Sequence, residues 1–331
     1  MPITTAKFCN FMAFEGEHEL NFVKGINVIM GENGTGKTTI LKAIYAAIQF
    51  SKNHSKDVFT GIGKYFSQNL QVAEELFNSE AHSYLVIYDD SDYAEITKFN
   101  IKPFKEDNVI GQTFGAELTA TEAIFIPTTE MISHSKGFLA LNRKYKLPFD
   151  ETQVDIISNA SLPETREISD TMVKILEKIS TVIDGTVIQE DDVFYVVKHD
   201  GRKIEFSLEA EGLRKFALIW KLIRNGLLES GSVLLWDEPE ANLNPELYEL
   251  AAEILLELQK NGVQVFVATH SYNFAKYLEI RRTEPEQVQF HNLYRTSDGR
   301  ICNESAFRME DLTQNHIMMA DNKLLNEIFD M

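Results

Sequence analysis

A glycine-rich segment near the N-terminus has the residue types and the spacing that bind phosphate. It reads "GENGTGKTT" and places Gly31, Gly36, Lys37 and Thr38 in the pattern G-x-x-x-x-G-K-T. Glycines let the backbone curl without Cβ clashes, so that successive N–H groups converge on phosphate oxygens. In this pattern the lysine reaches the β- and γ-phosphates of a nucleotide, and the threonine hydroxyl binds Mg²⁺. The segment therefore predicts a nucleotide site.

The residues on either side of this loop support that prediction. "INVIM" at 26–30 predicts a buried strand, and "TTILKAIYAAI" has apolar residues at helical spacing. The loop then lies at a helix N-terminus, where backbone donors and the helix dipole favour an anion. The alternative, a chance match in a glycine-rich turn, does not explain the strand before the loop and the helix after it. The predicted nucleotide-binding residues here are Asn33, Gly34, Gly36, Lys37, Thr38 and Thr39.

Two acids follow an apolar strand about 200 residues later. "VLLWDEP" places Asp237 and Glu238 at the strand's end. We expect Asp237 to share Mg²⁺ with Thr38, and Glu238 to act as the base that deprotonates the attacking water. Solvated carboxylates at a strand end are the alternative. His270 ends a second buried strand, "VQVFVATH", and is predicted to contact the γ-phosphate, although a lone histidine is more often a core or surface residue.

The elements that must position these residues follow an α/β pattern. "ITTAKFCNF" and "HELNF" predict strands ahead of "INVIM", residues 82–102 predict a hairpin around "DDSD", and "EAIFIP" predicts a short buried strand. Residues 128–184 are helical and irregular, and "VFYVV" with "KIEFSL" predicts a second hairpin. "EGLRKFALIWKLIRNG" and "PELYELAAEILLELQKNG" predict helices that end at Gly226 and Gly262. The insertion has no sustained heptads, which excludes a long coiled-coil arm.

Composition narrows the function classes. The 331 residues carry 50 acids and 32 bases, a formal charge of −18, which disfavours a dedicated nucleic-acid binder. One compact basic cluster, "NRKYK" with Arg143, Lys144 and Lys146, predicts a solvated face rather than a nucleic-acid site. No apolar run approaches the roughly 20 residues of a membrane span, and the N-terminus lacks a signal-peptide pattern. We expect a soluble, cytoplasmic protein without a membrane partner.

The motifs, in their order around a long insertion, resemble those of the ABC-type ATPases. The matching phrases are "GENGTGKTT", "VLLWDEPE", "ANLNPE" and "ATHS". The closest similarity is to the SMC/RecF/OLD-like branch, often labelled AAA-family ATPases of abortive-infection or toxin–antitoxin type. The resemblance implies an α/β, RecA-like P-loop NTPase with an ABC-type antiparallel β subdomain and a helical insertion. It divides the chain into a split core at 1–50 and 205–305, an insertion at 51–204 and a helical tail at 306–331.

The resemblance also implies a mechanism in which two subunits sandwich ATP and Mg²⁺. Each phosphate loop would bind one face of the nucleotide, and the signature helix of the second subunit would close over the γ-phosphate. The signature candidate is "EAEGLRKF", in which Gly212 would contact the nucleotide. Ala210 stands where the family uses a serine hydroxyl, which puts the rate of hydrolysis in question. Arg214 and Lys215 either compensate for that loss or simply face solvent.

Two further departures concern the other conserved loops of the family. "ANLNPE" has Asn244 where this branch commonly has histidine. No clear Q-loop glutamine is present. Glu130 occupies a comparable place after "EAIFIP", and we expect it to be a surface carboxylate rather than a metal ligand.

Two functions compete. The first is the ATPase of an antiviral defence or toxin–antitoxin system, which would dimerise with a second copy and control a separate effector or sensor. A separate effector is expected because the 28 residues after Asn303 are too few for a fused OLD-type nuclease domain. The second is a DNA-repair or chromosome-handling ATPase of RecF type. A transporter ATPase subunit would need a better signature sequence. A structural clamp that binds ATP without hydrolysis is compatible with Ala210, whereas Glu238 favours hydrolysis.

Overall fold

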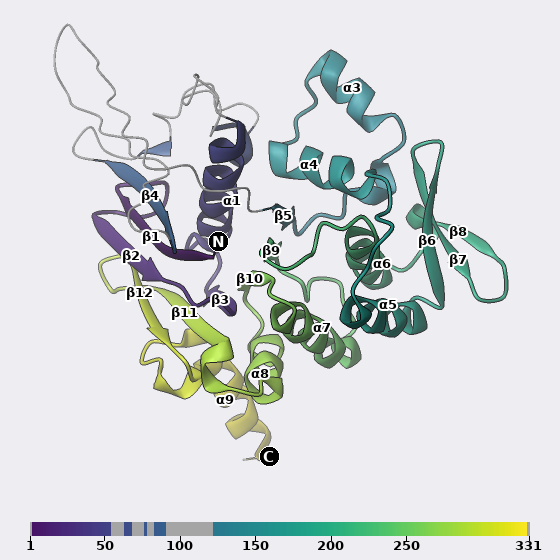
Figure 1. Cartoon of the computed structure of the whole chain (residues 1–331). Coiled ribbons are helices and arrows are strands. Elements are labelled where there is room, and N and C mark those ends of the chain that lie inside the picture. The colour runs from purple at the N-terminus through teal and green to yellow at the C-terminus, as the bar shows by residue number, and fades with distance from the viewer. Residues whose placement is uncertain (1, 54–62, 68–75, 78–82, 91–121, 330–331) are drawn as a thin grey trace, which may run out of the picture.

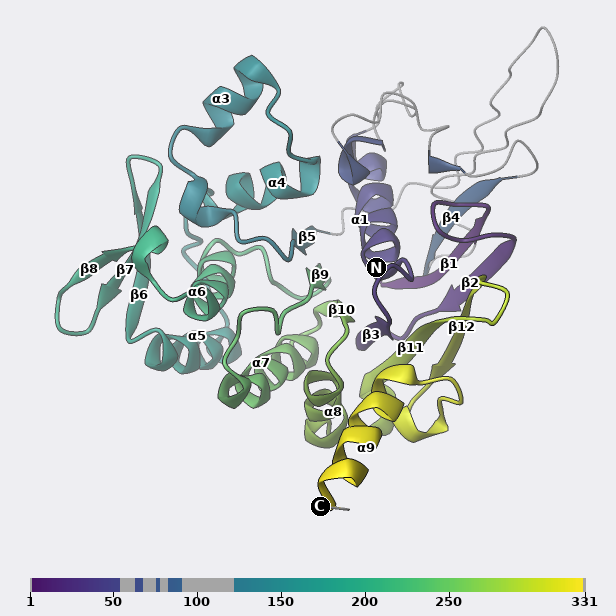
Figure 2. The same ribbon diagram turned by 180° about the vertical axis from the view of Figure 1, so that it is seen from behind.

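The computed structural model describes residues 2–53, 63–67, 76–77, 83–90 and 122–329 (Figures 1 and 2). The strands of these residues are β1 (Ile3–Cys9), β2 (Glu17–Asn21), β3 (Ile26–Gly31), β4 (Tyr84–Asp89), β5 (Ala123–Ile126), β6 (Gly185–Glu190), β7 (Val193–Lys198), β8 (Lys203–Glu205), β9 (Val233–Asp237), β10 (Gln264–Thr269), β11 (Val288–Arg295) and β12 (Ile301–Ala306). The α-helices are α1 (Lys37–Asn53), α3 (Phe138–Tyr145), α4 (Glu151–Ala160), α5 (Asp170–Val182), α6 (Glu211–Arg224), α7 (Tyr248–Lys260), α8 (Tyr272–Arg281) and α9 (His316–Phe329).

A six-stranded sheet forms the centre of the molecule. Its order is β12-β11-β3-β10-β9-β5, and all neighbouring pairs are parallel except β11 and β12. In the registers, Ala268 of β10 lies opposite Asp237 of β9, and Thr269 of β10 lies opposite Met30 of β3. The carboxyl ends of β3, β9 and β10 therefore meet at one edge, which is where open α/β sheets bind ligands.

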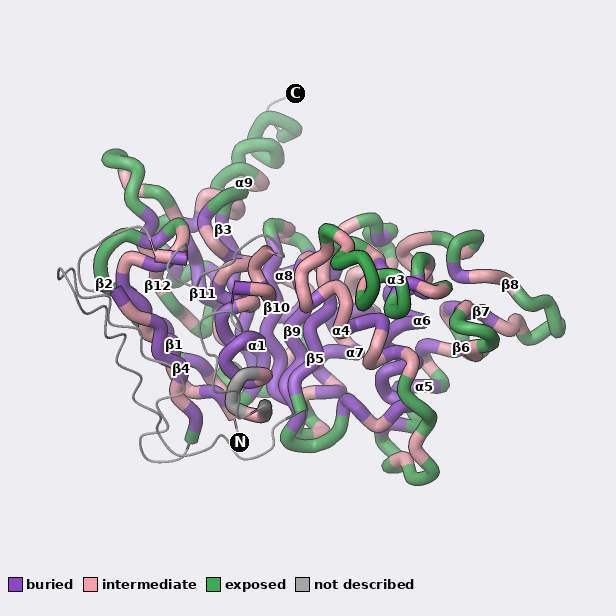
Figure 3. Tube along the Cα trace, turned by 90° about the horizontal axis from the view of Figure 1, so that it is seen from above, coloured by how far each residue is buried: buried purple, intermediate pink, exposed green. Residues whose placement is uncertain are grey.

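Alternate residues of this sheet pack against different layers. Val233 and Leu235 of β9 belong to the apolar cluster that contains α1, whereas Leu234 and Trp236 belong to the cluster that contains α6 and α7. Strands buried on both faces read as continuous apolar runs, which is why "SVLLW" contains no polar alternation after its serine. Figure 3 shows this buried centre, with α1 on it and the exposed end of α9 pointing away.

Two smaller antiparallel sheets flank the centre. The sheet β2-β1-β4 lies over α1, so that α1 is covered on both sides. The sheet β6-β7-β8 lies at the other end of the molecule beside α5 and α6, with α3 and α4 nearby (Figure 1). Gln264 joins the central sheet to β1, because its side chain exchanges hydrogen bonds of 2.8 Å with both backbone groups of Ile3.

Most of the predicted elements are confirmed. The helices α6 and α7, the strands β9 and β10, and the β7–β8 hairpin lie where the sequence predicted them. Strand β6 was not predicted. Of the proposed hairpin at 82–102, the first strand is β4, which pairs with β1, and residues 91–102 lie outside the described residues. Among the described helices, none has the length and apolar character needed to cross a membrane.

The division of the chain into core, insertion and tail stays a prediction. Two strands from the predicted insertion at 51–204 pair with strands from outside it: β4 with β1, and β5 with β9. The insertion therefore contributes to both the antiparallel and the central sheet.

Candidate nucleotide site

The loop between β3 and α1 has a backbone that only glycine accommodates at two positions. Gly31 has φ +148°, and a Cβ there would come within 2.2 Å of the carbonyl oxygen of Leu293 on β11. Gly36 has φ +92°, and a Cβ there would come within 2.6 Å of the ring of Phe14. L-residues rarely adopt these conformations, and both spaces are already filled. The two glycines of the predicted phosphate motif are therefore required by packing as well as by chemistry.

Lys37 is held close to this loop. Its Nζ donates hydrogen bonds to the carbonyl oxygens of Gly31 at 2.8 Å and Glu32 at 2.9 Å. Burial lowers the pKa of the Lys37 ammonium, and the nearby carboxylates of Glu238 and Asp237 oppose that shift. Asn33 and Gly34 lie exposed at the tip of the loop, and Thr38 and Thr39 begin α1 half-buried. The Gly34 carbonyl accepts a 2.8 Å hydrogen bond from Arg295, which fastens the tip to the end of β11.

Asp237 lies at the centre of an oxygen cluster. The hydroxyl of Thr38 donates to its two carboxylate oxygens at 3.0 and 2.9 Å, and the hydroxyl of Thr128 donates at 3.0 Å. Burial raises the pKa of Asp237, while the Thr38 and Thr128 hydroxyls stabilise its ionised form. Mg²⁺ prefers such oxygens and is usually held by one or two carboxylates together with substrate phosphates. The cluster therefore fits a magnesium ion that a nucleotide shares.

Thr128 was not predicted from the sequence. It follows β5, which runs parallel to β9 with Ile126 opposite Trp236. Residues just beyond the ends of neighbouring parallel strands lie side by side, and this places Thr128 next to Asp237. The polar residues directly after "EAIFIP" were the available signal.

Glu238 has a backbone conformation that is unusual for its type. Its φ is +50°, in the left-handed region, and its N–H donates to the Ala268 carbonyl at 2.9 Å. The Oε1 atom lies 3.0 Å from Nδ1 of His270, whose side chain is about half exposed. Strained residues of this kind concentrate at functional sites. The structure thus brings Glu238 and His270, which are 32 residues apart in sequence, into direct contact.

A second, deeply buried glutamate supports this pair. Glu240 accepts a hydrogen bond from the Thr269 hydroxyl, and its Oε1 lies 4.0 Å from Nδ1 of His270. Burial raises the pKa of Glu240. Together, Lys37, Asp237, Glu238 and Glu240 bring one ammonium and three carboxyl groups to one edge of the central sheet.

The predicted signature sequence begins α6. Ala210 occupies the N-cap position and makes no side-chain capping hydrogen bond. Gly212 packs closely against the "ANLNPE" loop, since a Cβ at Gly212 would lie 3.1 Å from the carbonyl oxygen of Asn242. Asn242 in turn donates a 2.8 Å hydrogen bond to Glu211. The first turn of α6 and this loop therefore form one unit. Asn244 caps the next turn by accepting a hydrogen bond from the Glu246 N–H at 3.2 Å.

The expectation that Glu130 is a surface carboxylate is wrong. Only 6% of its side chain is exposed, and it forms a 2.8 Å ion pair with Nη1 of Arg214 on α6. It also accepts hydrogen bonds from the N–H groups of Ile132 and Ser133. Arg214, one of the two basic residues predicted either to compensate for Ala210 or to face solvent, therefore binds Glu130. Lys215 does not face solvent either, because it is only 4% exposed.

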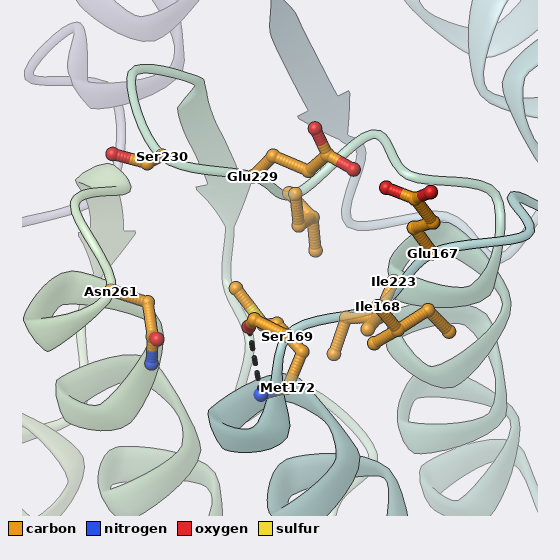
Figure 4. A pocket seen from close by; sticks show the side chains of 9 residues that line it. Glu167, Ile168, Ser169, Met172, Ile223, Glu229, Ser230 and Asn261 are labelled. Atoms are coloured by element: carbon orange, nitrogen blue, oxygen red, sulfur yellow. Dashed lines mark hydrogen bonds between the residues drawn. The ribbon is translucent and has the colours of Figure 1, made fainter.

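Two other surface features lie apart from these residues. Arg143, Lys144 and Lys146 are exposed at the end of α3, as the prediction of a solvated face requires. A pocket near the start of α5 is shown in Figure 4, where Ser169 accepts a 3.3 Å hydrogen bond from the N–H of Met172. None of the predicted site residues lines it.

One family model matches most of the chain. It is described as "AAA domain, putative AbiEii toxin, Type IV TA system" and matches residues 26–275.

Curated relatives match shorter segments. The L-cystine import ATP-binding protein TcyN of Bacillus subtilis is 48% identical over 109 residues, 30% of this chain and 41% of that protein. The DNA replication and repair protein RecF of Streptococcus suis is 30% identical over 128 residues, 38% and 32% respectively. The chain thus spans less than half the length of these relatives.

Solved structures match nearly the whole chain. The SMC head bound to the C-winged helix domain of ScpA has a TM-score of 0.56 at 13% identity, over 94% of this chain and 99% of that one. The SMC head domain with an extended coiled coil, bound to the C-terminal domain of ScpA and derived from Pyrococcus furiosus, has a TM-score of 0.50 at 11% identity, over 98% of this chain and 99% of that one. These matches confirm the predicted α/β, RecA-like P-loop fold. With the family model, they also confirm the resemblance to ABC-type ATPases of the SMC/RecF/OLD-like branch.

Proposed function

This chain belongs to the AAA-domain family described as putative AbiEii toxin of type IV toxin–antitoxin systems, and we propose that it is an ATPase that dimerises around Mg-ATP. The observation that carries the proposal is the convergence of Lys37, Asp237 and Glu238 at the carboxyl edge of one sheet. A buried ammonium for phosphate, a buried carboxylate with two hydroxyls for a metal, and a second carboxylate beside them are the groups that phosphoryl transfer to water needs.

Each group then has one task in the hydrolysis of ATP to ADP and phosphate. The backbone N–H groups of residues 33–39 and the Lys37 ammonium bind the phosphates. Thr38 and Asp237 would hold Mg²⁺, which would neutralise negative charge on the phosphates of the nucleotide. Glu238 accepts a proton from the water that attacks the γ-phosphorus. His270 orients the Glu238 carboxylate through the 3.0 Å contact at Nδ1. The predicted contact of Nε2 with the γ-phosphate requires protons on both ring nitrogens, because the carboxylate and the phosphate both accept hydrogen bonds.

The second half of the site comes from a second copy of the chain. Gly212 and the uncapped N-terminus of α6 would close over the partner's γ-phosphate, because a helix N-terminus without a side-chain cap presents free backbone donors to an anion. ATP thereby favours the dimer, and hydrolysis releases it. This switch would act on a separate effector or sensor in a defence or toxin–antitoxin system, in keeping with the family's description.

A DNA-repair role of RecF type is the alternative, and it rests on the similarity to RecF of Streptococcus suis. One experiment separates the two. ATP turnover and oligomeric state are measured for the wild type and for Glu238→Gln, with and without duplex DNA. Glu249→Gln serves as control, because Glu249 pairs with Arg281 away from Glu238.

We expect Glu238→Gln to lower kcat by roughly 10²- to 10⁴-fold and to accumulate an ATP-bound dimer. The control should match the wild type, and DNA should change nothing. Turnover that rises several-fold with DNA would favour the repair role. Wild-type protein that binds ATP without turnover would show that the site is a clamp.

A further inference from the structure

Helix α6 buries two lysines, and only one of them faces the candidate site. Lys215 is 4% exposed and Lys221 is 6% exposed. Lys221 pairs with the carboxylate of Glu164 at 3.2 Å, away from the phosphate loop. A buried ammonium is costly unless hydrogen bonds and nearby negative charge compensate it. The partners of Lys215 therefore indicate what its burial achieves.

Lys215 binds main-chain carbonyls of the turn that follows β9. Its Nζ donates to the carbonyl oxygen of Glu238 at 2.9 Å and to that of Pro239 at 3.3 Å. Burial lowers the pKa of Lys215, and the carboxylates of Glu240 and Glu211 oppose this shift by favouring the charged form. The lysine thus holds the backbone of the residue to which we assign the base.

That backbone needs support. Glu238 has φ +50°, in the left-handed region that non-glycine residues rarely adopt. Such residues persist only where their surroundings hold them firmly. Here the Glu238 N–H donates to Ala268 of β10, and its carbonyl accepts from Lys215 of α6 and from the Ala241 N–H at 3.1 Å within the same turn. Without Lys215, the turn would keep its bonds to β10 and to Ala241 and would lose its bond to α6.

We propose that Lys215 is a positioning residue for ATP hydrolysis, which fixes the carboxylate of Glu238 through the main chain and ties it to helix α6. The inference rests on the proposed function, because it takes Glu238 as the base. In the ATP-sandwich dimer, the N-terminus of α6 faces the partner's nucleotide, while Lys215 holds the base of its own subunit. A movement of α6 that starts at the partner's nucleotide therefore reaches the base beside the subunit's own nucleotide.

A role in stability alone makes a different prediction. A buried lysine that only fills space would affect folding, and nucleotide binding and turnover would then fall together. A positioning residue affects the chemical step and leaves nucleotide binding intact, because the phosphate loop makes no use of Lys215. Lys221→Met is the matched control, since it removes an equally buried ammonium from the same helix.

The test measures kcat and KM for ATP, binding of a fluorescent ATP analogue, and Tm, for the full chain as wild type, Lys215→Met and Lys221→Met. A misplaced base costs roughly 100-fold in rate, so we expect that loss in kcat for Lys215→Met. We expect KM and analogue affinity to stay within about twofold of wild type, and Lys221→Met to keep kcat within about twofold. If Lys215→Met does not fold, Lys215→Gln keeps an amide donor and should show a smaller loss in kcat.

Two results would overturn the inference. One is a Lys215→Met enzyme with wild-type kcat, and the other is an equal loss in Lys221→Met. In both cases the proposed function stands if the wild type turns over ATP and Glu238→Gln does not. A wild type without turnover overturns the function and the inference together.

Discussion

The ion pair between Glu130 and Arg214 offers a quantitative test of how α6 is anchored. It joins the segment after β5 to the first turns of α6, and the exposed side-chain fractions are 6% for Glu130 and 18% for Arg214. Removing one partner of a buried pair costs about 3–5 kcal/mol, because the other charge is left without compensation. Arg214 retains a 2.9 Å hydrogen bond from Nε to the carbonyl of Glu209 and is partly exposed, which reduces that cost.

We therefore expect Glu130→Gln to lower the free energy of unfolding by about 2–4 kcal/mol. The glutamine keeps an oxygen that accepts from the N–H groups of Ile132 and Ser133, so the loss reports mainly on the pair. Arg214→Met should cost a similar amount. The double variant should cost less than the sum of the two single losses, with a coupling energy of about 1–3 kcal/mol.

The assay is urea unfolding followed by circular dichroism for the wild type, the two single variants and the double variant. A double-mutant cycle isolates the pairwise contribution, provided that neither single variant forms new contacts. Coupling below about 0.5 kcal/mol would refute the reasoning, since residues without shared contacts are additive within that range. The exposed pair of Arg300 and Asp298 is the control, and its coupling should be much smaller than that of the buried pair, because solvent screens it.

Three further predictions test the loop, the signature helix and the core. Gly31→Ala should lower the free energy of unfolding by more than about 3 kcal/mol, because its Cβ would collide with the Leu293 carbonyl. Gly299→Ala is the control and should cost only about 1–2 kcal/mol, because nothing lies within 4 Å of its Cβ. Thermal unfolding compares the two variants. Ala210→Ser should raise turnover, because its hydroxyl would supply the contact to the partner's γ-phosphate that Ala210 lacks; an unchanged kcat would contradict this. Burial lowers the pKa of His291 from its ordinary value of 6.5 to about 3. Between these two pH values, the imidazole is protonated in the unfolded chain and neutral in the folded protein. Stability should therefore fall by up to about 1.4 kcal/mol per pH unit as pH drops from 6.5 towards 3, and His291→Gln should show a shallower loss in pH-dependent unfolding.

The parts of the site that were predictable are those defined by local spacing. The phosphate motif specifies its own turn, because its glycines, lysine and threonine act within nine consecutive residues. Asp237 and Glu238 were predictable for a similar reason, since an apolar strand that ends in acids places them at a sheet edge. Their direct contacts, Asp237 with Thr38 and Glu238 with His270, were not predicted, because they depend on how the strand ends lie in the tertiary structure. The fold class was predictable from the same motifs.

The environment of single charged residues was less predictable. Glu130 and Lys215 carry charges that usually face solvent, and nothing in their neighbours signals burial. Glu130 binds Arg214, which lies 84 residues away in sequence. Lys215 binds the carbonyl of Glu238, which lies 23 residues away. Such pairings depend on how α6 packs on the turn after β9 and on the segment after β5. Only the tertiary structure contains that information.

These contacts link two regions in which the sequence departs from the family's motifs, the segment after β5 and the start of α6. The segment after β5 binds Asp237 through Thr128 and α6 through Glu130, while α6 binds the turn of Glu238 through Lys215. The proposed metal ligand, the proposed base and the predicted signature helix are thus connected by side-chain contacts within a single subunit. Ala210 lies at the far end of that connection, where the partner's nucleotide would be. A missing hydroxyl there weakens one contact to the γ-phosphate. If α6 couples that contact to the base, Ala210→Ser should raise kcat only in protein that retains Lys215. If Ala210→Ser raises kcat equally in the Lys215→Met background, the signature and the base act independently, and the connection through α6 has no part in turnover.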